Sequence, residues 1–334
     1  MLKRSSSTRP KPAPPPILEP FNLSSFRVNL DVEITQEVIF TIQDKVILTK
    51  GSLLVLTGKP KARKSTFLQA FLGCAIKQQR IWGIESHIED DGELILVDTE
   101  QSLYDLQQSL KRLENAINIP LANHPRFVVY SARSCDVGDI IRMLDSILET
   151  HPKCKVLAID GLIDLVNDIN DVTESKMAIH YIKKICDAKQ IGVIGIIHQN
   201  KATNFSMGHL GAFASRHAQS ELAITKNDDG SSTLNATYLR SADNIDPIEI
   251  NYDALNQRYD LSRNINVPID YITRDWVEQV FEGKPGLTYR ELLINGKKYC
   301  RESQYHLEKK IIPILYAENI IEKRGNVIQI TRKT

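Results

Sequence analysis

The segment from Gly58 to Thr66 has the residue types of a phosphate-binding loop, with one departure. Such loops follow the pattern of glycine, four residues, then Gly-Lys-Ser/Thr. In "GKPKARKST", Gly58, Lys64 and Ser65 match this pattern, and Arg63 stands in place of the second glycine. Lys64 is expected to reach the β- and γ-phosphates of ATP, and the Ser65 hydroxyl is expected to help hold Mg²⁺. The expected nucleotide-binding residues are Gly58, Lys59, Pro60, Lys61, Ala62, Arg63, Lys64, Ser65 and Thr66.

Arg63 leaves three interpretations open: a working nucleotide site, an inactive relic, and a basic surface loop that matches by chance. Glycine normally lets the backbone approach the phosphates, so an arginine side chain must point away from them or over them. The apolar run at 52–58 predicts a buried strand before the loop, and the helical period of 65–79 predicts a helix after it. Amides at a helix N-terminus bind anions, so this context favours a working site.

Three acidic residues stand at the ends of other apolar runs. "KVLAIDG" leads to Asp160, at the position where a second acid completes a magnesium shell with Ser65. "LILVDTE" leads to Asp98 and Glu100. Glu100 is expected to polarise the attacking water as a general base, and the alternative is a carboxylate that caps the next helix. Asp98 is either a helper in this chemistry or a structural partner.

Short apolar runs alternate with helical patterns from about residue 26 to residue 263. Buried strands that alternate with helices predict a mostly parallel sheet covered on both faces, which is an α/β fold. The expected strands are 52–58, 93–100, 126–132, 155–161 and 191–199, and the expected helices are 65–79, 102–117, 137–150 and 174–189. Three later runs are joined by turn residues and predict an antiparallel extension, at 220–228, 232–241 and 247–253.

Residues 267–334 have a different pattern, three helical stretches and a terminal hairpin, which is the outline of a winged helix. From Gly286 to Thr334 there are ten Lys or Arg residues against five Asp or Glu. A local basic excess predicts contact with a nucleic-acid backbone, and a docking module for another protein is the alternative. The expected domains are a disordered basic, proline-rich tail at 1–25, an α/β domain at 26–263 and a small winged-helix-like α+β domain at 267–334.

Composition restricts the remaining classes of protein. Residues 1–16 hold five prolines, four basic residues and no acidic one, and such a segment cannot bury enough apolar surface to fold. The chain of 334 residues is 42% hydrophobic and 25% charged, as in ordinary globular proteins. No apolar run approaches the roughly 20 residues that cross a bilayer, and the N-terminus lacks the apolar core of a secretory signal. Five scattered cysteines without a CxxC pair indicate reduced thiols and a cytoplasmic protein.

The loop, "VDTE", "AIDG" and "IGIIHQNK" together resemble the RecA-like P-loop ATPases. Within these, the chain looks most similar to the ring-forming, hexameric replicative helicases of the plasmid RepA type, over about residues 30–260. The resemblance implies a RecA-like core with ATP and Mg²⁺ as cofactors. It also implies a polar sensor after the strand that follows the magnesium acid. His198 or Gln199 would fill that role near the γ-phosphate.

The same resemblance implies a residue that acts between subunits. "ATYLRSADN" is similar to the hairpin that carries a basic finger into the neighbouring subunit's site. Arg240 is then the candidate arginine finger, which stabilises transition-state charge in trans. Arg216 is a second candidate, and an exposed strand-end arginine is the other interpretation of Arg240. The expected catalytic residues are Lys64, Glu100, His198 and Arg240, in a homo-oligomer, a hexameric ring, that acts on single- or double-stranded DNA.

Two functions follow from these expectations. The first is an ATP-driven DNA motor of the helicase class, which serves the replication or mobilisation of a plasmid or mobile element. The second is an oligomeric ATPase that works as a switch, a loader or a DNA-binding regulator controlled by its ATP state. The acidic segment 161–175 is poor in Lys and Arg, which weakens the picture of threaded DNA. A small-molecule kinase would need a lid and an acceptor pocket, and the sequence shows neither.

Overall fold

A computed structural model describes residues 23, 27–33, 35–89, 91–200, 207–253, 258–261, 274–300, 311–317 and 320–331. Nearly all of the tail predicted at 1–25 lies outside these residues. Among the described residues, no helix combines the length and the apolar character that crossing a membrane requires.

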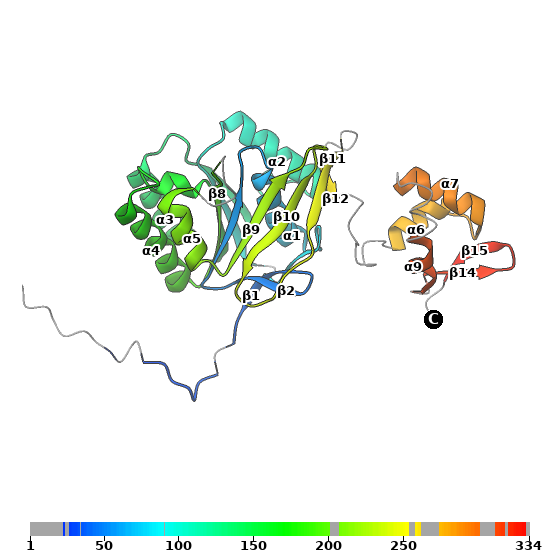
Figure 1. Ribbon diagram of the computed structural model, residues 1–334, viewed down its shortest axis with the longest axis horizontal. Helices are drawn as coiled ribbons and strands as arrows, with labels where there is room; N and C mark the ends of the chain where they lie inside the picture. Colours follow the sequence, from blue (N-terminus) through cyan, green and yellow to red (C-terminus); the bar gives the residue numbers. More distant parts are fainter. Residues whose placement is uncertain are drawn as a thin grey trace, which may run out of the picture. The chain divides into compact units, whose positions relative to one another are not determined.

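Nine strands between residues 53 and 261 form one sheet (Figure 1). In sheet order its strands are β12 (Arg258–Leu261), β11 (Ile248–Asp253), β10 (Ser232–Leu239), β9 (Ser220–Lys226), β3 (Leu53–Gly58), β8 (Gly192–His198), β7 (Cys154–Asp160), β5 (Glu93–Asp98) and β6 (Phe127–Ser131). Neighbours from β9 to β6 pair in parallel, whereas β10, β11 and β12 pair antiparallel. The predicted α/β class with a mostly parallel sheet is therefore confirmed.

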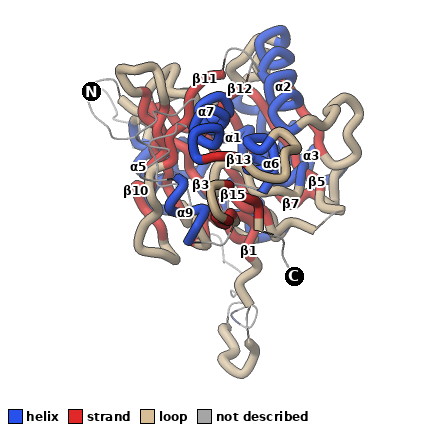
Figure 2. The backbone as a smooth tube through the Cα atoms, turned by 90° about the vertical axis from the view of Figure 1, so that its right-hand side faces the viewer, coloured by secondary structure: helices blue, strands red, loops and turns tan. Residues whose placement is uncertain are grey.

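Helices cover both faces of this sheet (Figures 1 and 2). They are α1 (Lys64–Lys77), α2 (Leu103–Ile117), α3 (Val137–Thr150), the short 3₁₀ helix η2 (Leu162–Leu165), α4 (Val172–Lys189) and α5 (Gly208–His217). One apolar cluster joins α1 and α2 to one face of the sheet, and a second cluster joins α3, α4 and α5 to the other. Every residue of β3 is buried, which explains its unbroken apolar sequence, because a strand covered on both faces needs apolar residues at each position.

A small second sheet was not predicted. It consists of β1 (Val38–Ile42), β2 (Lys45–Thr49) and β4 (Ile84–Ser86), in the order β2-β1-β4. Phe40 of β1 packs against Phe71 of α1, with the ring centroids 5.2 Å apart. This sheet therefore extends the apolar cluster around α1.

The sequence interpretation was wrong about one strand. It assigned 220–228 to the antiparallel extension, but β9 runs parallel to β3, with Gly58 opposite Ile224. The reason is α5, a helix that was not predicted and that returns the chain from the end of β8 to the start of β9. Antiparallel pairing begins only after the turn between β9 and β10.

The described residues from Arg274 onward form three helices and a three-stranded antiparallel sheet. These elements are α6 (Arg274–Phe281), β13 (Leu287–Thr288), α7 (Tyr289–Cys300), α9 (Ile312–Ala317), β14 (Ile321–Arg324) and β15 (Val327–Ile330). They have an apolar cluster of their own, which includes Phe281, Leu292 and Ile328. The terminal hairpin predicted for residues 267–334 is present in β14 and β15, and residues 301–310, 318 and 319 of the predicted helical stretches lie outside the described residues.

Candidate active site

Parallel pairing brings the predicted site residues to one edge of the sheet. Gly58 ends β3, His198 ends β8 and Asp160 ends β7, and these three strands are consecutive neighbours. Asp98 at the end of β5 lies in register with Asp160. Open α/β sheets bind ligands outside the carboxyl ends of their strands, so this edge is the candidate active site.

The loop between β3 and α1 has a backbone suited to an anion. Gly58 has no room for a side chain, because a Cβ atom there would lie 2.5 Å from the carbonyl oxygen of Ile224. Lys61 and Arg63 are left-handed, with φ values of 64° and 74°, and such residues turn successive amides into a concave anion site. Each costs on the order of 1 kcal/mol in a residue other than glycine. Strain of this kind is typical of ligand-binding loops.

The side chain of Arg63 points to the β9–β10 turn rather than over the loop. Its Nη1 atom donates to the Gly230 carbonyl oxygen at 2.6 Å and to the Ser232 hydroxyl at 3.2 Å. Its guanidinium carbon lies 4.9 Å from the ring centroid of Tyr259 on β12. Arg63 thus takes the left-handed backbone that glycine usually provides, while its side chain is bound elsewhere.

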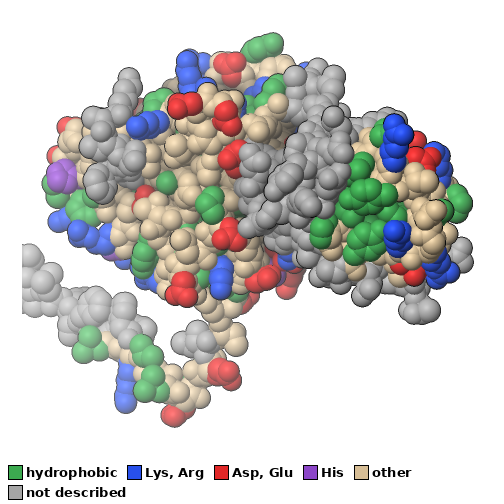
Figure 3. Space-filling model, turned by 45° about the vertical axis from the view of Figure 1, so that its right-hand side comes forward, with side chains coloured by type: hydrophobic (Ala, Val, Ile, Leu, Met, Phe, Trp, Pro, Cys, Tyr) green, Lys and Arg blue, Asp and Glu red, His purple; other side chains and the backbone are tan. Residues whose placement is uncertain are grey.

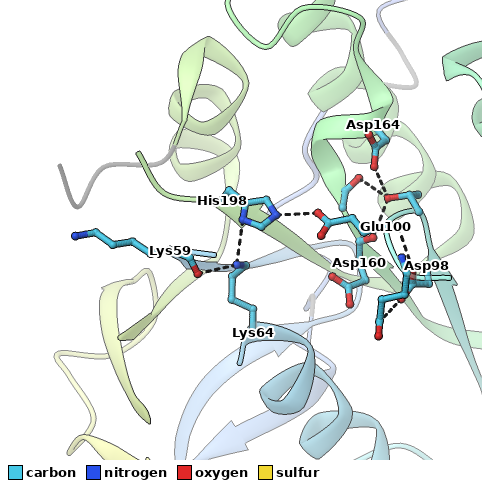
Figure 4. Close-up of polar contacts among 10 residues, drawn as sticks. Lys59, Lys64, Asp98, Glu100, Asp160, Asp164 and His198 are labelled. Atoms are coloured by element: carbon cyan, nitrogen blue, oxygen red, sulfur yellow. Dashed lines mark hydrogen bonds and ion pairs between the residues drawn. The ribbon is translucent and has the colours of Figure 1, made fainter. Parts of the chain in front are cut away.

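His198 lies between Lys64 and Glu100 (Figure 4). Its Nδ1 atom is 3.2 Å from Lys64 Nζ, and its Nε2 atom is 2.9 Å from Glu100 Oε1. One neutral tautomer satisfies both contacts: the ammonium donates to Nδ1, and Nε2–H donates to the carboxylate. Lys64 Nζ also donates to the Lys59 carbonyl oxygen at 3.2 Å. We refer to these contacts as the Lys64–His198–Glu100 chain.

The charges of the Lys64–His198–Glu100 chain suit the binding of a phosphate and a water molecule. Burial lowers the pKa of the Lys64 ammonium, and the nearby carboxylates of Glu100 and Asp160 act in the opposite direction. The hydrogen bond from His198 lowers the pKa of the Glu100 carboxyl. Glu100 is therefore a carboxylate at neutral pH, and a carboxylate can accept a proton from water.

Ser65 and Asp160 fit the predicted magnesium site. Burial raises the pKa of Asp160 to about 7, a hydrogen bond from Ser65 opposes this rise, and the negative charge of Asp98 adds to it. Hydroxyl and carboxylate oxygens are ligands that Mg²⁺ uses together with phosphate oxygens and water. Among the described residues, no group of three or more His, Cys, Asp or Glu could hold a metal alone. Phosphate oxygens of a bound nucleotide and water would supply further ligands.

Hydrogen bonds separate the alternatives that the sequence left open at two strand ends. Asp98 Oδ1 accepts the amides of Glu100 and Gln101 at 3.0 and 2.7 Å, so Asp98 is a structural partner in this turn. Ser102, rather than Glu100, caps α2 by accepting the Asp105 amide. At the end of β8, the Gln199 side chain donates to Thr57 Oγ1 at 3.3 Å. His198 is therefore the residue of this pair that contacts Lys64.

The two candidate arginine fingers do not join this group within their own chain. The Arg240 amide donates to the Gln219 carbonyl oxygen, and the Gln219 amide donates to Leu53 at the start of β3. The loop begins at the other end of β3, five residues or roughly 17 Å away. Arg216 lies at the C-terminal end of α5, 5.7 Å from the Phe213 ring. A role for either in trans remains a prediction.

One feature of this edge was not predicted: a pocket next to Thr66. It has a volume of about 410 Å³ including its open mouth, and it lies between α1, α2, the turn at Trp82 and Tyr259 of β12. We refer to it as the Trp82–Tyr259 pocket. The two aromatic residues stand singly in segments for which the sequence predicted no element, so no pattern indicated that they meet.

Replacing Asp160 with asparagine is expected to stabilise the nucleotide-free, magnesium-free protein above neutral pH. The folded protein binds the Asp160 proton more tightly than the unfolded chain, because its pKa is raised to about 7, so the wild type loses stability as the pH rises towards that value. Asparagine removes this loss and keeps an acceptor for Ser65. Denaturant unfolding at pH 5 and pH 8 measures the free energy of unfolding. At pH 8 this free energy is expected to be higher in Asp160→Asn than in the wild type, by an amount on the order of a few kcal/mol. The exposed Asp228→Asn variant is the control, and an equal effect in both variants would contradict the prediction.

A comparison with protein-family models matches residues 19–204 to a family described as an AAA domain. The matched segment is more than half of the 334-residue chain and includes the loop, Glu100, Asp160 and His198. No curated protein matches the chain.

Proposed function

We propose that this chain, which belongs to the AAA domain family of P-loop ATPases, is an ATP-driven motor that acts on DNA, as its resemblance to the RepA-type helicases implies. Family membership makes the protein a nucleotide-binding ATPase. The proposal adds the helicase class, a hexameric ring, and a role in the cytoplasm in the replication or mobilisation of a plasmid or mobile element.

The Lys64–His198–Glu100 chain, beside Ser65 and Asp160, is the observation that supports hydrolysis at this edge. The loop amides and Lys64 bind the β- and γ-phosphates. Glu100 accepts a proton from the attacking water. Mg²⁺, when bound by Ser65 and Asp160, supplies charge neutralisation at the phosphates. When Lys64 turns to the phosphates, His198 loses one of its two contacts, so its position reports the occupancy of the γ-phosphate site.

Replacing His198 with alanine is expected to lower kcat while ATP binding stays within a few-fold of the wild type. Glu100 would lose the hydrogen bond that orients it and lowers its pKa, which should cost about ten- to thirtyfold in kcat. Turnover and the ATP dissociation constant are measured separately, with the exposed His209→Ala variant as the control. A kcat within twofold of the wild type would remove His198 from the mechanism.

The ring and its DNA substrate are supported by the resemblance to RepA-type helicases and by the position of Arg240. This arginine is exposed and lies at the edge of the sheet opposite its own loop. An arginine finger acts on a site other than its own subunit's when subunits share their active sites, as they do in a ring. Its location suits that arrangement better than a role in its own site.

Contact with DNA is assigned in this proposal to the C-terminal elements, interpreted as a winged-helix-like domain. Arg290, Lys323 and Arg324 are exposed there. On the face of the molecule in Figure 3, the described acidic and basic side chains are interspersed. The distribution of charges on this face therefore does not define a DNA-binding surface. The local basic excess after Gly286 is the feature that suits a phosphate backbone.

One observation favours the alternative, an oligomeric non-motor ATPase that works as a switch, loader or DNA-binding regulator. The acids of 161–175 are engaged within the structure: Asp164 accepts from Thr99, Asp171 caps α4, and Glu174 accepts the Asn167 amide. These bonds hold an acidic segment in place after β7. Such a segment repels a DNA backbone rather than gripping it.

ATP hydrolysis measured with and without single-stranded DNA, across a range of protein concentrations, tests the proposal. Turnover that rises steeply with protein concentration and with DNA is expected for a motor with shared sites. Tight ATP binding with negligible hydrolysis under every condition would favour the switch. A preference for one duplex sequence over single strands would also favour it.

A further inference from the structure

The Trp82–Tyr259 pocket begins where the phosphate loop ends, and no step of the proposed hydrolysis uses it. Thr66, the last residue of the loop motif, lies in its wall. We interpret Thr66, which follows the magnesium-binding Ser65, as the loop residue beside the α-phosphate. A group attached to the α-phosphate of a bound nucleotide would therefore enter this pocket.

The pocket suits a flat, apolar group. It is open to solvent, and its lining is mostly apolar, with Ile81, Leu113 and Ile117 among the wall residues. Trp82 contributes an aromatic wall that is fixed by an edge-to-face contact with Phe67, with the ring centroids 5.6 Å apart. Gln69 also lines the pocket, but its amide nitrogen donates to the Ser109 hydroxyl at 2.6 Å. Thr66 and Arg112 are the other residues with polar side chains in the lining, and the rest of it is apolar or aromatic, so stacking is the main interaction that these walls offer to a ligand.

A second aromatic wall residue, Tyr259, is held by Arg63 of the phosphate loop. The Arg63 guanidinium lies against the Tyr259 ring, and it is fixed by Gly230 and by the buried hydroxyl of Ser232. Tyr252 on the neighbouring strand packs on the same ring, with the centroids 5.1 Å apart. A guanidinium over an aromatic ring stabilises the pair, so Arg63 ties the position of Tyr259 to the loop.

We propose that this pocket holds the base of the nucleoside triphosphate by stacking, and that Arg63 is a positioning residue that keeps Tyr259 in its wall. The inference rests on the proposed ATPase function, because the base reaches the pocket only when the phosphates occupy the loop. It gives a physical reason for arginine at a position where glycine is usual. Because the walls are mostly apolar or aromatic and offer mainly stacking, ATP and GTP are used with kcat/KM values within about thirtyfold of each other.

Fluorescence of Trp82 tests the pocket. The chain has two tryptophans, so Trp276→Phe leaves Trp82 as the single reporter. Magnesium ATP is expected to change its emission, whereas magnesium tripolyphosphate, which has no base, inhibits ATP hydrolysis without that change. Hydrolysis of ATP with no change in emission, or equal changes with both compounds, would overturn the pocket and leave the ATPase standing. A protein that neither binds nor hydrolyses any nucleotide would overturn both.

Steady-state kinetics test the role of Arg63. Tyr259→Ala is expected to raise KM for ATP about tenfold or more, as the loss of one base-stacking contact does, with kcat within about twofold. Tyr259→Phe restores most of this loss, and Tyr238→Ala, an exposed tyrosine on β10 of the same sheet, is the control. Arg63→Gly raises KM in the same way and adds little to Tyr259→Ala, because both changes remove one wall.

Inhibition by tripolyphosphate separates the role of the Arg63 backbone in the phosphate loop from the role of the Arg63 side chain against Tyr259. Arg63→Gly is expected to bind it as the wild type does, since glycine adopts the left-handed backbone without strain. Weaker tripolyphosphate binding in Arg63→Gly, additive effects of the two substitutions, or an unchanged KM in Tyr259→Ala would each overturn the positioning role. A preference for ATP over GTP above about thirtyfold would overturn recognition by stacking.

Discussion

Replacing Lys64 with alanine is expected to abolish both ATP binding and ATP hydrolysis. The Lys64 ammonium is the buried positive charge that faces Glu100 and Asp160. Without it, the phosphates would meet these two carboxylates with less compensation, and the developing charge at the γ-phosphate would lose its stabilising cation. Loss of such a group costs about a hundred- to a thousandfold or more in kcat. Calorimetric titration with ATP and steady-state turnover measure the two effects.

The matched control for this substitution is Lys111→Ala, which removes an exposed lysine on α2. Binding and turnover close to the wild type are expected there. Full ATP turnover in Lys64→Ala would rule out the assignment of the nucleotide site to this loop. Retained binding with lost turnover would instead limit Lys64 to catalysis.

Replacing Arg240 with alanine is expected to leave ATP binding intact and to lower hydrolysis about a thousandfold, the range known for arginine fingers. The reason is that Arg240 lies away from its own loop and would act on the site of a neighbouring subunit. A mixture of Arg240→Ala and Lys64→Ala proteins tests this directly. Each variant is inactive alone, but a mixed ring places the intact Arg240 of one variant beside the intact Lys64 of the other. Partial recovery of turnover is the expected result.

Wild-type turnover by Arg240→Ala would remove this residue as the finger and leave it as an exposed arginine at a strand end. Arg216→Ala would then be the next variant to examine. Loss of turnover without recovery in the mixture, at concentrations where the wild type is active, would argue against shared sites.

The sequence predicted most of the elements that position the site. The run at 52–58 became β3 at Leu53–Gly58, and the helix predicted at 65–79 became α1 at Lys64–Lys77. These predictions succeed because the period of apolar residues is a local property that follows from which faces are buried. The sequence also placed Asp160 and His198 at the ends of predicted strands, and the structure brings them to one edge because the carboxyl ends of parallel strands share an edge.

Strand order could not be obtained in this way. β8 lies between β3 and β7, and this order brings His198 between Lys64 and Glu100. The parallel direction of β9 was missed because α5 was not predicted. Its sequence begins with glycine and has only a short apolar pattern, and the polar segment before it made the whole stretch resemble a loop. Pairing between distant strands depends on the packing of the whole sheet, and a single sequence carries no local signal of it.

By itself, the sequence determined a phosphate loop between a buried strand and a helix, with acids at the ends of two further strands. These features depend on residue types and on spacing along the chain. Only the tertiary structure decided which groups the side chain of Arg63 contacts. Arg63 meets Gly230, Ser232 and Tyr259, which lie more than 160 residues away along the chain. That contact exists because the β9–β10 turn and β12 reach the loop in three dimensions, and no local pattern records it.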